Sequence, residues 1–149
     1  MRVTYKVLAY LVAGLVVVQA MAIVYAISGM SKWVEGGGVL DAATMADQSA
    51  TPFPEVSGFA IHGMNGMMVI PIVALLLLVA SFFAKVPGAS LWALSIVALV
   101  ALQITLGFVS FSAPWAGALH GLNALALFSV AIMAGRRVRS VAVAQPVAA

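Results

Sequence analysis

The sequence contains no cysteine and very little charge. Only 7% of its 149 residues are Asp, Glu, Lys or Arg, whereas 64% are hydrophobic. The lack of cysteine excludes disulfides, thiolate metal sites and cysteine-based redox chemistry. A soluble domain carries roughly 25% charged residues. The few charged residues of this chain could not cover so much apolar surface in a soluble fold. The composition therefore predicts an integral membrane protein, with the lipid bilayer as its main partner.

Lys, Arg, Asp and Glu are absent from four long apolar segments, at about 7–29, 58–84, 89–111 and 115–135. Each reaches the roughly 20 residues that a membrane-spanning helix needs. Backbone groups in lipid must be paired within the segment, which favours helices, and no alternating polar pattern indicates a β-barrel. The first segment exceeds the usual apolar run of a signal peptide, so we expect it to be a span of the mature protein.

The basic residues predict the orientation of the spans. If there are four spans, one side of the membrane receives six of the seven basic residues, and only Lys32 falls on the other side. The excess of Lys and Arg marks the cytoplasmic side. We therefore expect a multi-pass protein of the plasma membrane with both termini in the cytoplasm. The six residues are Arg2, Lys6, Lys85, Arg136, Arg137 and Arg139.

The connections between the spans predict the fold. An acidic outer loop covers 30–57, the other two connections are short, and a basic cytoplasmic tail covers 136–149. Short connections make neighbouring helices antiparallel, so we expect a single all-α domain, an up-down four-helix bundle. The net charge of +3 does not indicate a nucleic-acid partner, because the basic residues flank membrane segments.

Rare polar residues recur in the same order in both halves of the chain. The first and third spans contain Leu-x-x-x-Gln, ending at Gln19 and Gln103, and the second and fourth contain His-Gly-x-Asn, beginning at His62 and His120. Apolar stretches match easily by chance, but polar residues at similar depth are stronger evidence. The pattern predicts a duplicated helical hairpin.

This repeat places the only two histidines opposite each other. The second and fourth spans run in the same direction and lie diagonally across an up-down bundle, with both histidines roughly 6–9 Å below the helix starts. Two imidazoles at one depth can hold a single flat cofactor, and haem b with two axial histidines is the obvious candidate. We therefore predict that His62 and His120 ligate haem iron; another metal, or a purely structural role, is left open.

Six further residues are predicted to complete this cofactor site. The glycine after each histidine leaves room for a macrocycle, and the asparagine three residues on lies on nearly the same face. The glutamines of the other two spans could supply hydrogen bonds to the ligands. The alternatives are close helix packing for the glycines and interhelical hydrogen bonding for the amides. The residues are Gly63, Gly121, Asn65, Asn123, Gln19 and Gln103.

The His-Gly-x-Asn helices resemble one four-helix half of the haem A synthase family, in which one histidine from the second helix and one from the fourth approach a haem. The resemblance implies that His62 and His120 are axial ligands. The resemblance does not imply haem A synthesis, because two family features are missing. Phe59 stands near the position of the family's carboxylate, and Gly63 stands where the family has an arginine. The chain is also similar to small four-span actinobacterial membrane proteins, a resemblance that implies no activity.

The sequence therefore predicts a haem b-binding membrane protein for electron transfer, haem handling or redox sensing. The alternative is a non-catalytic accessory or assembly subunit of a membrane complex, with the histidines joining helices. We do not expect a stand-alone enzyme. A membrane redox partner or quinone is the expected partner, and a homodimer that rebuilds an eight-span assembly is left open.

Overall fold

The computed structural model describes residues 1–47 and 51–143, with side chains as far as 138, and no strand occurs among them. The basic tail predicted at 136–149 therefore lies partly outside the described residues. The described elements are α1 (Arg2–Glu35), α2 (Ala42–Ala46), the 3₁₀ turn η1 (Pro54–Val56), α3 (Ser57–Met64), the π-helical segment η2 (Asn65–Val69), α4 (Ile70–Phe83), α5 (Ala89–Val109) and α6 (Pro114–Val143).

Four of these helical stretches are long and apolar enough to cross a membrane. This confirms the predicted all-α, four-span membrane protein. The bounds differ most for α1, which begins and ends about six residues beyond the predicted 7–29. The apolar window marks the membrane-buried part, but the helix continues through Lys32 and Glu35 until Gly36 and Gly37, whose φ is +97°. At 1.5 Å per residue α1 is about 50 Å long, so it extends beyond the bilayer.

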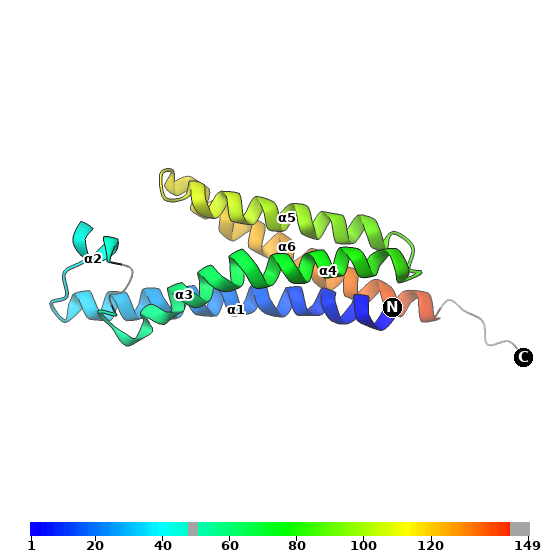
Figure 1. Ribbon diagram of the computed structural model, residues 1–149, viewed down its shortest axis with the longest axis horizontal. Coiled ribbons are helices and arrows are strands. Elements are labelled where there is room, and N and C mark those ends of the chain that lie inside the picture. Colours follow the sequence, from blue (N-terminus) through cyan, green and yellow to red (C-terminus); the bar gives the residue numbers. More distant parts are fainter. Residues whose placement is uncertain (48–50, 144–149) are drawn as a thin grey trace, which may run out of the picture.

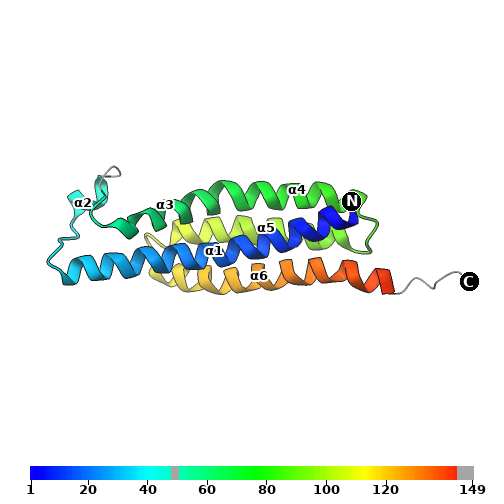
Figure 2. The same cartoon turned by 90° about the horizontal axis from the view of Figure 1, so that it is seen from below.

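The four long helices form an up-down bundle (Figures 1 and 2). α1 packs against α4 and α6, and α5 packs against the same two helices. Among the described residues, the diagonal pairs α1–α5 and α4–α6 make no extensive contact. This arrangement is the predicted one. We call α1 with α3, η2 and α4 hairpin one, and α5 with α6 hairpin two.

The packed core occupies the half of the bundle that contains the N-terminus. Its largest fully buried side chains, Tyr5, Val12, Leu77, Ile96 and Leu127, come from all four long helices. Alanines fill most other core positions and let the helices approach closely, as is typical of membrane bundles. The core cluster includes no residue of α3. The main packed core therefore lies toward one end of the bundle.

At the opposite end the two hairpins diverge (Figure 1). α3 packs against α1, where Gly58 lies so close to the Ala22 carbonyl that a Cβ would clash. In the part of the chain that the structure describes, α3 makes no extensive contact with α5 or α6. Helix α6, in contrast, packs against both α5 and α1.

A π-helical segment separates α3 from α4. Pro71 follows it in the first turn of α4 and has no N–H to donate to the carbonyl four residues earlier, where its ring also clashes. The extra residue in the π turn of η2 relieves this conflict. The π turn thus lies directly after the helix that carries His62.

The loop between α1 and α3 is held at its base rather than over the bundle. The Trp33 and Phe53 rings lie 5.6 Å apart, and Glu55 packs against Gly29 of α1. Helix α2 is capped by Asp41, whose carboxylate accepts a 2.8 Å hydrogen bond from the Thr44 amide. None of its residues is buried.

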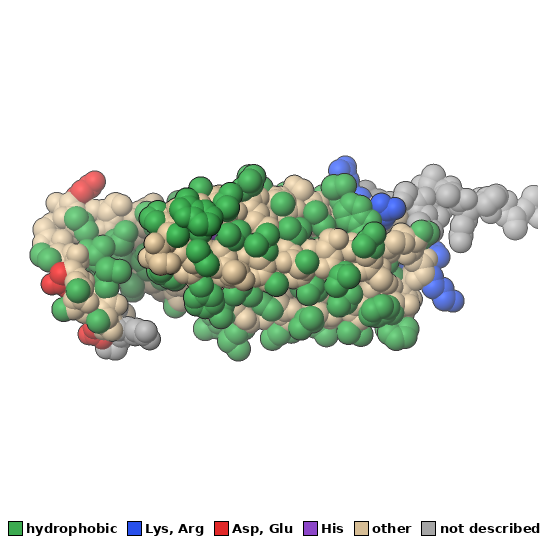
Figure 3. Space-filling view, turned by 90° about the horizontal axis from the view of Figure 1, so that it is seen from above, with side chains coloured by type: hydrophobic (Ala, Val, Ile, Leu, Met, Phe, Trp, Pro, Cys, Tyr) green, Lys and Arg blue, Asp and Glu red, His purple; other side chains and the backbone are tan. Residues whose placement is uncertain are grey.

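Charged side chains gather at the two ends of the molecule (Figure 3). On the face shown, acidic side chains lie at the loop end and Lys and Arg at the opposite end, with apolar side chains between them. Lys32, in the last turn of α1, is a basic residue at the loop end. The N-terminus and the last described turn of α6 share the basic end (Figure 1). This is the distribution expected of a multi-pass membrane protein, and the orientation in the membrane stays a prediction.

Candidate functional site

The two histidines come together where the packed core ends. His62 lies on α3 and His120 on α6, and their ring centroids are 6.2 Å apart with 46° between the ring planes. Both side chains are half-buried. The structure thus brings the two rings to a common level between the hairpins.

Each imidazole is held by a backbone carbonyl of the partner helix in its own hairpin. His62 Nδ1 is 3.1 Å from the Gln19 carbonyl oxygen, and His120 Nδ1 is 3.0 Å from that of Gln103. Because a carbonyl oxygen can only accept, each Nδ1 donates the proton and each Nε2 is left as a base. Neither Nε2 makes a hydrogen bond within the described residues, so both are available as metal ligands.

In hairpin one, Asn65 ties α1 to the segment that follows His62. Its amide nitrogen donates to the Leu15 carbonyl at 3.1 Å and to Gln19 Oε1 at 3.2 Å. The residue is buried, with 7% of its surface exposed. The same α1 turn therefore anchors both the histidine and the asparagine.

In hairpin two, Asn123 makes the same two contacts. Its amide nitrogen donates to the Leu99 carbonyl at 2.9 Å and to Gln103 Oε1 at 2.6 Å. The Leu-x-x-x-Gln and His-Gly-x-Asn motifs thus share three hydrogen bonds in both halves. Sequence reasoning grouped these residues but missed that the backbone of each glutamine, not its side chain, binds the imidazole.

One position explains the main difference between the two copies. Gln103 Nε2 donates to the His120 carbonyl at 3.0 Å, whereas Gln19 makes no such bond to His62. A Cβ on Gly66 would lie 2.5 Å from Gln19 Nε2. Because glycine has no side-chain methyl group, the Gln19 amide can occupy this space. The equivalent residue in hairpin two is Ala124, which has that methyl.

The first copy also leaves a polar atom without a partner. Asn65 Oδ1 is buried and accepts no hydrogen bond, whereas hairpin two has no such orphan among the described side chains. An unpaired buried carbonyl costs about 1–3 kcal/mol. The hydrogen bonding around His62 is therefore less complete than that around His120.

The glycines that follow the two histidines in the chain are exposed. No atom lies within 4 Å of where a Cβ would stand on Gly63 or Gly121, so both positions next to the histidines are open. At Gly107 a Cβ would approach the His120 ring at 3.3 Å, so α5 needs a small residue there for the ring to fit. Sequence reasoning missed Gly107; its only signal is its place one turn after Gln103.

The donor set fits a macrocyclic cofactor better than a bare ion. The described residues contain no group of three or more His, Cys, Asp or Glu that could hold a metal ion. Two imidazoles suffice where a porphyrin supplies the other ligands. Imidazole nitrogens ligate metals at about 2 Å, so two rings that share one ion have centroids about 6 Å apart. The 6.2 Å separation agrees with this requirement.

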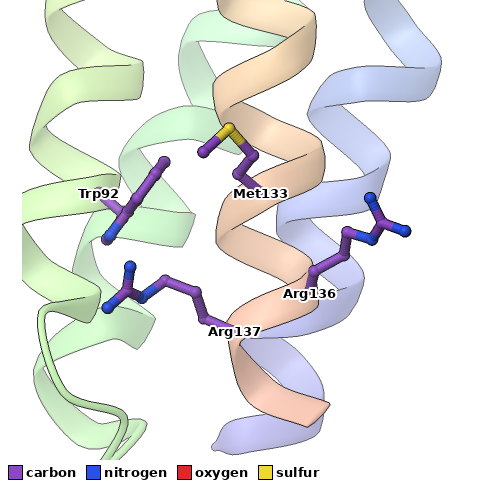
Figure 4. Close-up of a pocket in the computed structure, with 4 residues that line it drawn as sticks. All are labelled: Trp92, Met133, Arg136 and Arg137. Atoms are coloured by element: carbon purple, nitrogen blue, oxygen red, sulfur yellow. The ribbon is translucent and has the colours of Figure 1, made fainter. Parts of the chain in front are cut away.

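Two hollows lie away from the histidines. One, of about 520 Å³, is formed by the end of the outer loop and the first residues of α3, including Phe53 and Phe59. The other is a shallow groove of about 270 Å³ at the basic end, beside Trp92 (Figure 4). Neither includes a histidine.

Comparisons of the chain with known protein families, with curated proteins and with solved structures found no match. The resemblance to one half of haem A synthase therefore stays a prediction that depends on the His-Gly-x-Asn motifs. The fold and the site define a four-span membrane protein with two paired histidines between duplicated hairpins.

Proposed function

We propose that the protein is a small membrane cytochrome that binds one haem b between His62 and His120. The observation that carries this proposal is the pair of imidazoles at 6.2 Å, each with Nδ1 held by a carbonyl and Nε2 without a partner. A carbonyl that accepts from Nδ1 fixes the tautomer and the ring orientation that metal ligation needs.

The residues around the rings would each have a defined task. The Gln19 and Gln103 backbones orient the imidazoles, and Asn65 and Asn123 hold those backbones in place. The open space at Gly63 and Gly121 would admit the macrocycle edges. A bound haem supplies one-electron redox chemistry.

Electron transfer is the task that this ligand set favours. If His62 and His120 both held the iron, they would leave it no open coordination position for oxygen chemistry. His62 lies on α3, toward the loop end of the bundle (Figure 1), where the acidic side chains gather (Figure 3). This end faces the outer side of the plasma membrane if the termini are cytoplasmic. A quinone or a membrane redox protein would be the partner, and haem handling or redox sensing are alternative uses of the same site.

The direct test is spectroscopic. The protein is expressed with ample haem, purified in detergent, and examined by reduced-minus-oxidised spectra and haem quantification. We expect b-type bands in the parent protein, and loss of the bands in the double variant His62→Ala/His120→Ala. Ser129→Ala is the matched control, because Ser129 is an exposed residue of α6 that bonds only within its own helix. Absent bands in the parent, or unchanged bands in the double variant, would overturn the proposal.

A second function is favoured by the self-contained character of the network. Both Nδ1 atoms and both asparagine amide nitrogens already have partners, so the motifs can join the helices of each hairpin without a cofactor. The chain would then be an accessory or assembly subunit of a membrane complex. Co-purification of a stable partner together with a haem-free protein would favour this function. Metal analysis of the same sample distinguishes iron from copper or zinc.

A further inference from the structure

The basic end of the bundle carries a groove that the haem proposal does not use. It lies between the first turns of α5 and the last described turns of α6, has a volume of about 270 Å³, and is lined by Trp92, Met133, Arg136 and Arg137 (Figure 4). It is shallow and open toward the surroundings of the bundle.

The groove has an apolar part and a cationic part. The Arg137 guanidinium lies over the Trp92 ring, 5.1 Å from its centroid, and Met133 extends from one turn earlier toward the same ring. Since α6 runs toward the basic end, Met133 lies on the membrane side of Arg137. Arg136 extends the other way, toward α1 (Figure 4).

This combination fits one class of ligand. Basic pockets between membrane helices bind anionic lipid headgroups, and the planar guanidinium matches the geometry of a phosphate. Stacking on an indole orients the guanidinium, and Trp is enriched at this membrane level. A free phosphate has no apolar part that could pack against the apolar wall, whereas a lipid acyl chain would lie along it.

We propose that the groove between α5 and α6 binds an anionic phospholipid, with its phosphate at Arg137 and an acyl chain along Met133 and Trp92. The proposal is independent of the haem site. It also differs from the general attraction of basic residues to anionic membranes, which would draw equally on Arg136 and on Lys6 at the same end of the bundle.

The test compares two adjacent arginines of equal charge. Full-length protein in mild detergent is titrated with phosphatidylglycerol or phosphatidylcholine, and bound lipid is counted by native mass spectrometry. We expect the parent to prefer phosphatidylglycerol. One basic residue near an anionic headgroup is worth about a fivefold change in affinity, so Arg137→Gln should lose about fivefold and Arg136→Gln less than twofold.

Further variants make the result decisive. Trp92→Leu keeps the charge but removes the ring, and it should weaken phosphatidylglycerol binding by a factor similar to Arg137→Gln. Lys6→Gln should change it little, and added inorganic phosphate should not displace the lipid. Circular dichroism checks that each variant is folded. Equal losses for Arg136→Gln and Arg137→Gln, or no preference for phosphatidylglycerol in the parent, would overturn the proposal.

Discussion

Hairpin one and hairpin two carry the same polar motif but do not hold it equally well. In both, the histidine Nδ1 binds a glutamine carbonyl and the asparagine bridges to the same helix. Hairpin two adds the bond from Gln103 Nε2 to the His120 carbonyl and runs as continuous α-helix past the motif. Hairpin one lacks that bond, leaves Asn65 Oδ1 unpaired and interrupts its helix with a π turn.

Two copies of the same motif can therefore differ in how rigidly their surroundings hold them. Helix α6 packs against both α5 and α1, whereas within the described residues α3 packs mainly against α1 and its own chain neighbours η1 and η2. We therefore expect His120 to be the better fixed of the two rings.

The largest expected effect comes from removing one ring at a time. His62→Ala leaves His120, the better-fixed ring, as the single ligand. His120→Ala leaves only His62, which is less well fixed. One hydrogen bond is worth about 1 kcal/mol, so His62→Ala should retain roughly fivefold more haem than His120→Ala. Haem per protein after purification in detergent measures this. Equal retention by the two variants would remove the distinction between the hairpins.

Replacing each asparagine tests the same asymmetry without a cofactor. Asn123→Leu removes bonds of 2.9 and 2.6 Å, and at about 0.6 kcal/mol or somewhat more per intramembrane bond it should cost about 1–2 kcal/mol. Asn65→Leu removes bonds of 3.1 and 3.2 Å but also an unpaired oxygen, so it should cost less than about 1 kcal/mol. Unfolding by sodium dodecyl sulfate in mixed micelles measures both. A larger loss for Asn65→Leu would contradict the ranking.

The next prediction converts one hairpin into the other. In Gly66→Ala the new methyl meets only the end of the Gln19 side chain, which can turn toward the His62 carbonyl as Gln103 does toward that of His120. Ala also suits a helix better than Gly, so the free energy of unfolding should rise by up to about 1 kcal/mol. Ala124→Gly is the matched reverse change and should lower it by a similar amount.

The outcome of Gly66→Ala is read from the same micelle titration and from haem retention in the background of His120→Ala, which should increase. A loss of more than about 1 kcal/mol in Gly66→Ala would mean that Gln19 cannot move, and that the missing methyl is required rather than merely tolerated.

The smallest effect concerns the loop that only hairpin one has. The hydrogen bond from the Thr44 amide holds the pKa of Asp41 below its ordinary value. A lowered pKa means that the cap is fully effective above the ordinary carboxyl pKa of about 4 and is lost as the pH falls through the lowered pKa. Amide hydrogen exchange at Thr44 should therefore show less protection at acid pH after correction for intrinsic rates. Asp41→Asn should remove most of this pH dependence.

Much of the architecture could be predicted from the sequence because lipid leaves the chain few choices. Charge-free segments of sufficient length must be helices, and short connections make neighbouring helices antiparallel. The motifs also predicted that His62 and His120 would meet, since two parallel diagonal helices carried them at one depth. What composition could not give was the register of α3 against α1, which the close approach of Gly58 to Ala22 sets.

Other features could not be predicted because the sequence allows several local conformations of similar energy. The π turn before Pro71 resolves a local backbone conflict, and a proline in a span can also be accommodated by a plain kink. The role of Gly66 depends on which way the Gln19 amide points, a choice between side-chain conformations of similar energy. The groove at Trp92 and Arg137 joins residues from two helices whose rotation about their axes periodicity does not determine.

The concentration of buried alanines at one end has a mechanical meaning. Tight contacts there fix the angle at which the hairpins separate. This angle in turn sets the distance between the two imidazoles, which lie toward the other end of the bundle. The distance between His62 and His120 thus depends on packing contacts that touch neither ring.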